Sequence, residues 1–145
     1  MHYEGTIEAP IPRAKFYSFI TEPKNIVEIL PDVVGSSIAD RDRFTVKAKA
    51  GVAHLRGNIE IHFEVLEKTE GRRAKIAGHG QGMQSSLEMA LEIKLEDAPT
   101  GTAAAWVADV AVGGLLASVG GRLIDGVASK YIQQITENLR AKASK

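Results

Sequence analysis

Cysteine is absent from the 145 residues, and neither sign of charge prevails, since Lys and Arg number 18 and Asp and Glu also number 18. Without cysteine the chain forms no disulfide and offers no thiolate as nucleophile or metal ligand, which fits a cytoplasmic protein. Without a surplus of positive charge it lacks the basic surface that neutralises a phosphate backbone. We therefore expect no nucleic-acid partner.

Long hydrophobic runs are also scarce. The one stretch with little charge is 98–121, in which Asp109 is the sole charged residue. A membrane-spanning helix needs about 20 mostly apolar residues, but Asp109 divides this run and two glycine pairs interrupt it. We interpret the stretch as a buried strand, a glycine turn and the start of a helix. The N-terminus carries early charge and no apolar core, so we expect no signal peptide.

Recognisable catalytic or metal-ligating patterns are missing too. His54 and His62 share the polar face of one predicted strand, but eight residues of strand separate them by about 26 Å, too far to share a metal ion. No pair of residues has the His-x-x-x-His or Glu-x-x-His spacing of helical metal sites. Ser85 and Ser86 lack the glycines of a nucleophile elbow. We predict no metal, no cofactor and no catalytic residue.

What is present is a clear change of apolar period along the chain. A short strand at 3–9 precedes two short helices between Pro12 and Pro31. Apolar residues then alternate with polar ones, which predicts antiparallel strands at 44–50, 55–65, 74–82, 87–95 and 102–112. A helical period over about 115–142 predicts one long C-terminal helix. The expected fold class is α+β, with all of 1–145 forming a single domain.

Glycine recurs at every second position in "IAGHGQGMQ" (76–84), as Gly78, Gly80 and Gly82. A phosphate-binding loop would need a helix to begin directly after the glycines, but the next residues alternate as a strand does. The three glycines therefore continue the inward phase of Ala74 and Ile76. Glycine there permits strong sheet curvature or close approach. They either serve curvature alone or leave part of the space open as an apolar cavity.

Glycine also appears in the predicted C-terminal helix, at positions 120, 121 and 126. We expect Gly120 to face inward, where it serves either close packing on the sheet or a hinge over a cavity. In the preceding strand, Asp109 lies on the face opposite to Trp106, and the pattern does not say which face is buried. We expect Asp109 at the surface, paired with a basic residue such as Arg122, and Trp106 either in the core or at a cavity wall.

Four stretches in this order are similar to a known family: "GTIEAPIPRAKFYSFITEPKNIVEILPDV" (5–33), "KAKAGVAHLRGNIEIHFEV" (47–65), "GHGQGM" (78–83) and "WVADVAVGGLLASVGGRLID" (106–125). The chain resembles the CoxG family, the carbon monoxide dehydrogenase G subunits, which belongs to the START-like, helix-grip (SRPBCC) superfamily. One departure is Asp32, where the family usually has glycine.

The resemblance implies a curved antiparallel sheet of about seven strands wrapped around the C-terminal helix, with an apolar cavity between them. It also implies an accessory role for a CO-dehydrogenase-type molybdenum hydroxylase. That role would be recruitment to the inner membrane face or delivery of a lipid-like or quinone-like electron acceptor. The resemblance carries over no catalytic residue.

The leading hypothesis is a cytoplasmic binding module that holds an apolar lipid-, isoprenoid- or quinone-like molecule. The predicted cavity walls are Leu55, Ile59, Ile61, Gly78, Gly80, Met89, Leu116, Gly120, Leu123 and Val127. One alternative is a cyclase- or hydrolase-like enzyme acting on aromatic or polyketide-like substrates. Another is a docking subunit without a ligand, which would use the "VAVGGLLASVGG" stretch to bind a membrane or a partner.

Overall fold

The computed structural model describes residues 1–143, which form one sheet and three α-helices. Strand β1 (His2–Ala9) leads into helices α1 (Arg13–Thr21) and α2 (Pro23–Ile29). Pro12 precedes the first turn of α1 and Pro23 opens α2, positions that tolerate proline because their backbone N–H groups have no partner within the helix. Both short helices are therefore confirmed.

Six further strands complete the sheet: β2 (Val33–Ile38), β3 (Arg43–Val52), β4 (Leu55–Thr69), β5 (Arg73–Gly82), β6 (Ser85–Ala98) and β7 (Gly101–Gly114). All neighbours are antiparallel in the order β1-β7-β6-β5-β4-β3-β2, so the first strand pairs with the last. The sequence pattern missed β2, because its central residues are glycine and serine and its pairing with β3 shifts register between Val33 and Gly35.

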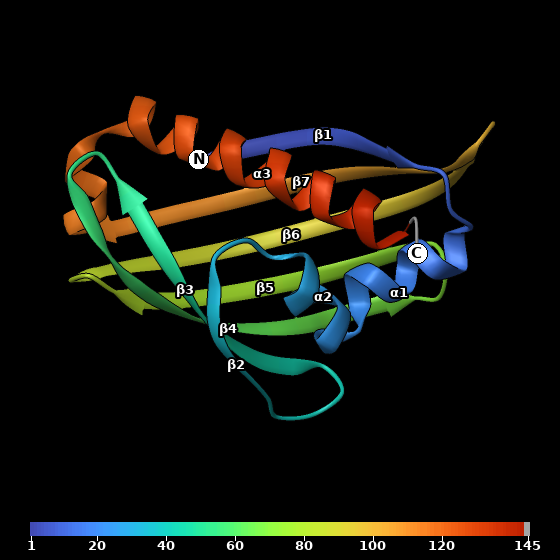
Figure 1. Cartoon of the computed structure of the whole chain (residues 1–145), viewed down its shortest axis with the longest axis horizontal. Coiled ribbons are helices and arrows are strands. Elements are labelled where there is room, and N and C mark those ends of the chain that lie inside the picture. The colour runs from blue at the N-terminus through green and yellow to red at the C-terminus, as the bar shows by residue number, and fades with distance from the viewer. Residues whose placement is uncertain (144–145) are drawn as a thin grey trace.

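The long helix α3 (Gly121–Ala143) lies across the inner face of the curved sheet, and α1 and α2 cover one end of it (Figure 1). The opposite end carries the β3–β4 and β5–β6 turns together with the segment between β7 and α3. This arrangement is the α+β helix-grip architecture that the family resemblance implied.

The start of the C-terminal helix differs from the prediction. Strand β7 continues to Gly114, a 3-10 helix η1 (Leu115–Val119) follows, and Gly120 separates η1 from α3. Gly120 has a φ of 94°, which only glycine adopts without strain. It is exposed, and no atom lies within 4 Å of the place where a Cβ would stand. The prediction that Gly120 lies inside the helix and faces inward is therefore wrong.

Asp32 occupies a strained backbone position. Its φ is 59°, in the left-handed region that glycine adopts freely and an aspartate adopts at a cost. Its carbonyl accepts a hydrogen bond of 3.0 Å from the amide of Lys49 at the start of the β2–β3 ladder. Glycine, which the family resemblance leads us to expect at this position, would adopt this φ without strain.

The packed core is concentrated at the end of the sheet that α1 and α2 cover. One cluster joins Phe16, Ile29 and Ala104 to Leu139 near the end of α3. A second cluster lies beneath α2, where the rings of Phe44 and Phe63 stack with centroids 5.0 Å apart. The C-terminal part of α3 is thus anchored in the core, and its N-terminal part is not.

Candidate ligand-binding cavity

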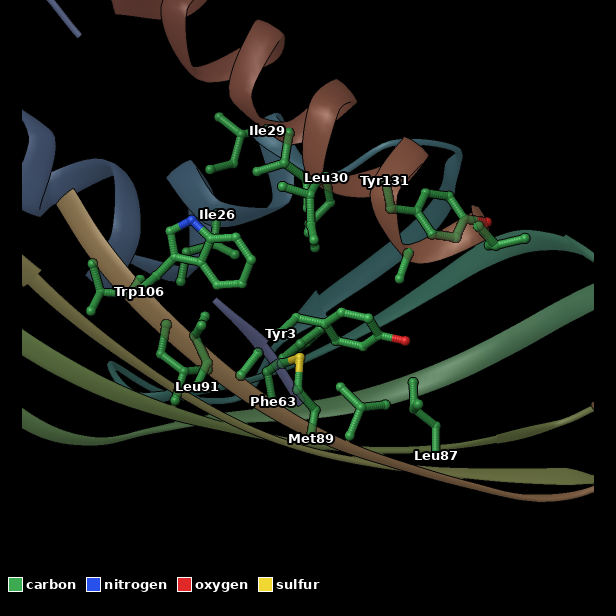
Figure 2. A pocket seen from close by; sticks show the side chains of 18 of the residues that line it. Tyr3, Ile26, Ile29, Leu30, Phe63, Leu87, Met89, Leu91, Trp106 and Tyr131 are labelled. Carbon is green, nitrogen blue, oxygen red and sulfur yellow. The ribbon is translucent and has the colours of Figure 1, made fainter. Parts of the chain in front are cut away.

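A cavity of about 400 Å³ lies between the inner face of the sheet and α3 (Figure 2). Among the described residues that line it, none is acidic, basic or a histidine; the side-chain polar atoms are the hydroxyls of Tyr3 and Tyr131 and the indole nitrogen of Trp106. Ligand cavities of proteins typically measure about 300–1,000 Å³ and are mostly apolar. In size and chemistry this cavity suits an apolar small molecule.

The floor of the cavity comes from the inward phase of the central strands. On β7 the inward residues are Trp106, Ala108 and Val110, and Asp109 points to solvent. The facing of this strand, which the sequence left open, is thereby decided. Cross-strand neighbours extend the floor, because Leu91 pairs with Ala108 and Met89 with Val110.

The roof is α3, and its two halves differ. Leu139 is 2% exposed and belongs to the core. In the first half Leu123 is 47% exposed, and Val127 faces the cavity half-buried. At Gly121 and Gly126 no atom lies within 4 Å of the place where a Cβ would stand, so neither mediates close contact with the sheet. Close packing through the helix glycines is therefore wrong. The cavity extends beneath both halves of α3, since Ile124 and Val127 line it from the first half and Ile135 and Leu139 from the second.

The alternating glycines of β5 lie one layer behind the cavity wall. Gly78 and Gly80 are buried and face inward in phase with Ile76, as predicted. Side chains of neighbouring strands cover them: Phe63 and Met89 lie 3.2 and 3.3 Å from a Cβ built at Gly78. Those two side chains also line the cavity. The glycines thus let large neighbours lie low over the sheet.

The ten predicted wall residues separate into two groups. Ile59, Met89, Leu116 and Val127 line the cavity, and their contact with a ligand stays a prediction. The residues that do not line it are Leu55, Ile61, Gly78, Gly80, Gly120 and Leu123. Leu123 does not line it because the face of α3 that meets the cavity is centred on Ile124, Val127 and Tyr131, which leaves Leu123 47% exposed at the side of the helix. Gly78 does not line it because Phe63 and Met89 cover it, and Gly80 does not because Leu87 and Ile59 lie over it.

Sequence reasoning missed the part of the wall that comes from the N-terminal third. Tyr3 and Ile7 of β1 reach the cavity, as do Ile20, Ile26 and Leu30 from the two short helices. The apolar positions of α1 and α2 signalled burial, but nothing local indicated that they would close one end of the same cavity.

Two tyrosine hydroxyls tie the first half of α3 to the sheet. The Tyr3 hydroxyl donates to Asp125 Oδ1 at 2.6 Å, and the Tyr131 hydroxyl lies 3.5 Å from the Lys49 carbonyl oxygen. Burial, aided by the hydrogen bond to Asp125, raises the pKa of Tyr3 to about 12. Burial, aided by the negative charge of Asp32, also raises the pKa of Tyr131. Both side chains are thus neutral hydrogen-bonding groups at neutral pH.

Ionisable groups elsewhere pair on the outer face of the sheet. Asp109 lies 2.8 Å from His2 Nδ1 across the β1–β7 pair, so it is at the surface as expected but its partner is not Arg122. His79 contacts Glu88, and His62 contacts Thr45 and Glu60. Within residues 1–143 no group of three or more His, Cys, Asp or Glu side chains has the geometry to hold a metal ion.

Comparison with known families gives one match over almost the whole chain. The sequence model of the family described as the carbon monoxide dehydrogenase G subunit (CoxG) matches residues 5–144. The chain belongs to the CoxG family. No curated protein matches it.

Solved structures share the helix-grip fold of this CoxG family member at low sequence identity. A conserved protein from Geobacillus kaustophilus superposes with a TM-score of 0.91 at 19% identity, covering 99% of this chain and 95% of that one. A START superfamily protein from Mycobacterium smegmatis gives 0.73 at 12% identity, covering 99% and 97%. A Chromobacterium violaceum protein gives 0.71 at 15% identity, covering 100% and 99%. At these identities the likeness shows the fold alone.

No helix among the described residues is both long enough and apolar enough to span a membrane.

Proposed function

We propose that this CoxG family member is a binding module that holds one apolar molecule, lipid-, isoprenoid- or quinone-like, in the cavity between the sheet and α3. The observation that carries the proposal is a cavity of about 400 Å³ whose described walls offer no charged side chain. Burying each methylene of such a ligand contributes about 0.8 kcal/mol. A charged ligand would lose its hydration there without finding a counter-charge.

Binding is proposed in preference to catalysis because the described cavity walls offer few groups that could take part in a reaction. Cyclisation or hydrolysis needs groups that transfer protons or attack the substrate. The described walls supply two tyrosine hydroxyls, and each already contacts an acceptor of the protein. The family assignment supports an accessory role beside a CO-dehydrogenase-type molybdenum hydroxylase, to which the module would bring its ligand.

The experiment that tests this function is native mass spectrometry of freshly purified protein, followed by organic extraction and identification of what is released. We expect one apolar molecule per chain, or uptake of one from a lipid extract added to the empty protein. A protein that is purified empty and takes up nothing from the extract would contradict the binding function.

A second role, association with a membrane surface, is favoured by the end of the molecule where η1 lies. Leu115 and Leu123 are large hydrophobic residues that are 39% and 47% exposed, and they flank the break at Gly120. Arg122 and Lys130 are exposed on the same segment of chain. Apolar side chains beside cations suit the interface of a bilayer that contains anionic lipid. We propose that this end meets the membrane from which the ligand comes.

Vesicle co-sedimentation tests the membrane role, using phosphatidylcholine vesicles with and without phosphatidylglycerol. Because burial of the exposed part of two leucines contributes on the order of 1–2 kcal/mol, the double variant Leu115→Ser/Leu123→Ser should bind vesicles about tenfold more weakly. Leu66→Ser is the matched control, since Leu66 is 56% exposed on β4, away from η1. Equal loss in both variants, or no sedimentation of the parent protein, would contradict the role.

A further inference from the structure

A second concavity, separate from the apolar cavity, lies at the end of the sheet near the start of α1. It is a groove of about 590 Å³ lined by Arg13, Thr69, Arg72, Arg73, Lys94, Leu95, Glu96 and Asp97. None of these residues lines the apolar cavity. Four of them are cationic and two are acidic, in a chain whose overall net charge is zero.

The cations are brought together by strand register and by one turn. Thr69, Arg73 and Lys94 are directly opposite one another across β4, β5 and β6. The β4–β5 turn adds Arg72, and Gly71 in that turn accepts a hydrogen bond of 3.1 Å from Arg13 Nη1. Like charges directly opposite each other in an antiparallel pair destabilise it, so the Arg73–Lys94 pair calls for a counter-charge.

The protein's own acids supply that counter-charge only in part. Asp97 is engaged by Arg13 Nε at 2.8 Å. Glu92 lies 3.6 Å from Arg73 and 3.6 Å from Lys94, beyond the range of a good charged hydrogen bond. Arg73 Nε is buried and is the one buried side-chain nitrogen or oxygen of the described chain without a hydrogen-bond partner. Such an orphaned donor requires an explanation.

We propose that this groove binds a phosphate-type oxyanion, either free phosphate or the phosphate of a small phosphorylated molecule. The guanidinium groups of Arg72 and Arg73 offer the forked donor geometry that phosphate oxygens match. The Lys94 ammonium adds a point charge, and the Thr69 hydroxyl adds a neutral donor. The bound anion would separate the opposed charges of Arg73 and Lys94 and give the guanidinium donors an acceptor.

The test is titration of the isotope-labelled full chain with inorganic phosphate at constant ionic strength, followed by amide chemical shifts, with chloride as reference and glycerol phosphate as a second arm. We expect saturable shifts confined to Arg13 and residues 69–73 and 94–97, with a dissociation constant on the order of 1 mM. Tighter binding of glycerol phosphate would identify a phosphorylated small molecule as the source, and equal or weaker binding would identify free phosphate.

Two variants and one matched control decide the outcome. Arg73→Gln and Arg72→Gln should each weaken phosphate binding about tenfold. Because Arg72 is exposed, Arg72→Gln should fold normally and still measures the loss of phosphate binding even if Arg73→Gln impairs folding. Arg56→Gln removes the same charge at the other end of the sheet, where Arg56 binds backbone carbonyls of its own turn, and should leave binding unchanged. Non-saturable shifts, or equal weakening by Arg56→Gln, would overturn the proposal. Because the groove and the cavity share no residue, this test is independent of ligand extraction.

Discussion

Asp109 is the one charged residue in the low-charge stretch 98–121, and it pairs with His2 on the solvent face of β7. The two side chains are directly opposite across the β1–β7 pair, on the solvent face. Hydrogen bonds that the His2 imidazole donates to the carboxylates of Asp109 and Glu4 raise the pKa of His2. Because Asp109 points away from the cavity, it can hold the N-terminal strand without touching a ligand.

Asp109→Asn should therefore change the pKa of His2 without changing ligand uptake. We expect the pKa of His2 to fall in a proton NMR titration, because the largest cause of its elevation is removed. Uptake of an apolar probe such as phenylnaphthylamine should change by no more than a few-fold. A hundredfold loss of uptake would mean that Asp109 acts on the cavity after all.

The tyrosines offer a second test at the scale of single residues. The pKa values of all three, Tyr3, Tyr17 and Tyr131, are raised above the ordinary value of 10.0, with burial as the leading cause. A folded-state pKa above the unfolded one means that the native state holds its proton more tightly. The resulting stability is present below pH 10 and is lost as the pH rises toward 12.

An ultraviolet absorbance titration measures this directly. In the folded protein the phenolate steps of all three tyrosines should lie above pH 10, and Tyr3 should ionise near pH 12. Tyr3→Phe should remove that step and lessen the loss of stability between pH 10 and 12. A full phenolate step at pH 10 in the folded protein would contradict the buried environment of these side chains.

Helix α3 combines an anchored end and a loosely packed end within one element. Near its C-terminus, Leu139 is buried against the core, and Asn138 Nδ2 donates to the Ile29 carbonyl at 3.0 Å. At its beginning, Leu123 is exposed, and the side-chain hydrogen bond from Tyr3 to Asp125 joins the helix to β1. Where few apolar contacts hold a segment, local opening costs little. The first half of α3 is therefore the place where the cavity would open.

The same substitution at the two ends of the helix should have very different effects on stability. Leu139→Ala should lower the free energy of unfolding by about 2–5 kcal/mol, because it leaves a cavity in the packed core. Leu123→Ala should change it by less than about 0.5 kcal/mol, as exposed substitutions do. Urea unfolding monitored by circular dichroism measures both. Similar losses at the two positions would contradict the division of α3.

At the scale of the whole molecule, the cavity exists because the helix and the sheet diverge from a shared packed end. Ala108 lies on the cavity floor in the middle of β7, and Ala111 lies three residues further on the outer face. Tryptophan in place of Ala108 would fill the cavity, whereas tryptophan in place of Ala111 would lie outside it.

Ala108→Trp should abolish uptake of the apolar probe, at least tenfold, because the indole occupies the space that the probe needs. Stability should fall by less than the roughly 1–3 kcal/mol typical of overpacking, since the new side chain enters an existing cavity. Ala111→Trp, the control, should leave probe binding unchanged. Probe fluorescence and urea unfolding together measure the two effects. Equal probe binding by Ala108→Trp and the parent would contradict the location of the site.

The sequence by itself determined the two short helices and the central strands with their inner faces. Strict alternation through Leu55–Val65 and Leu87–Leu95 can bury only one face of a strand, so the meander and the inward phase of Gly78 followed from period two. The prolines marked both short helices because their rings fit helix starts. The extent of a single domain over 1–145 stays a prediction.

Tertiary structure decided what depends on contacts between distant segments. Both faces of β7 carry small apolar residues, such as Ala105 and Ala108, so only its pairing with β6 and β1 could turn Trp106 inward and Asp109 outward. The positive φ of Gly120 arises where β7 must turn toward α3, and no local pattern distinguishes it from a helical glycine. The cavity is set by the distance between helix and sheet. That distance is fixed by packing around Leu139 and by α1 and α2, which are far in sequence from the strands that form most of the floor.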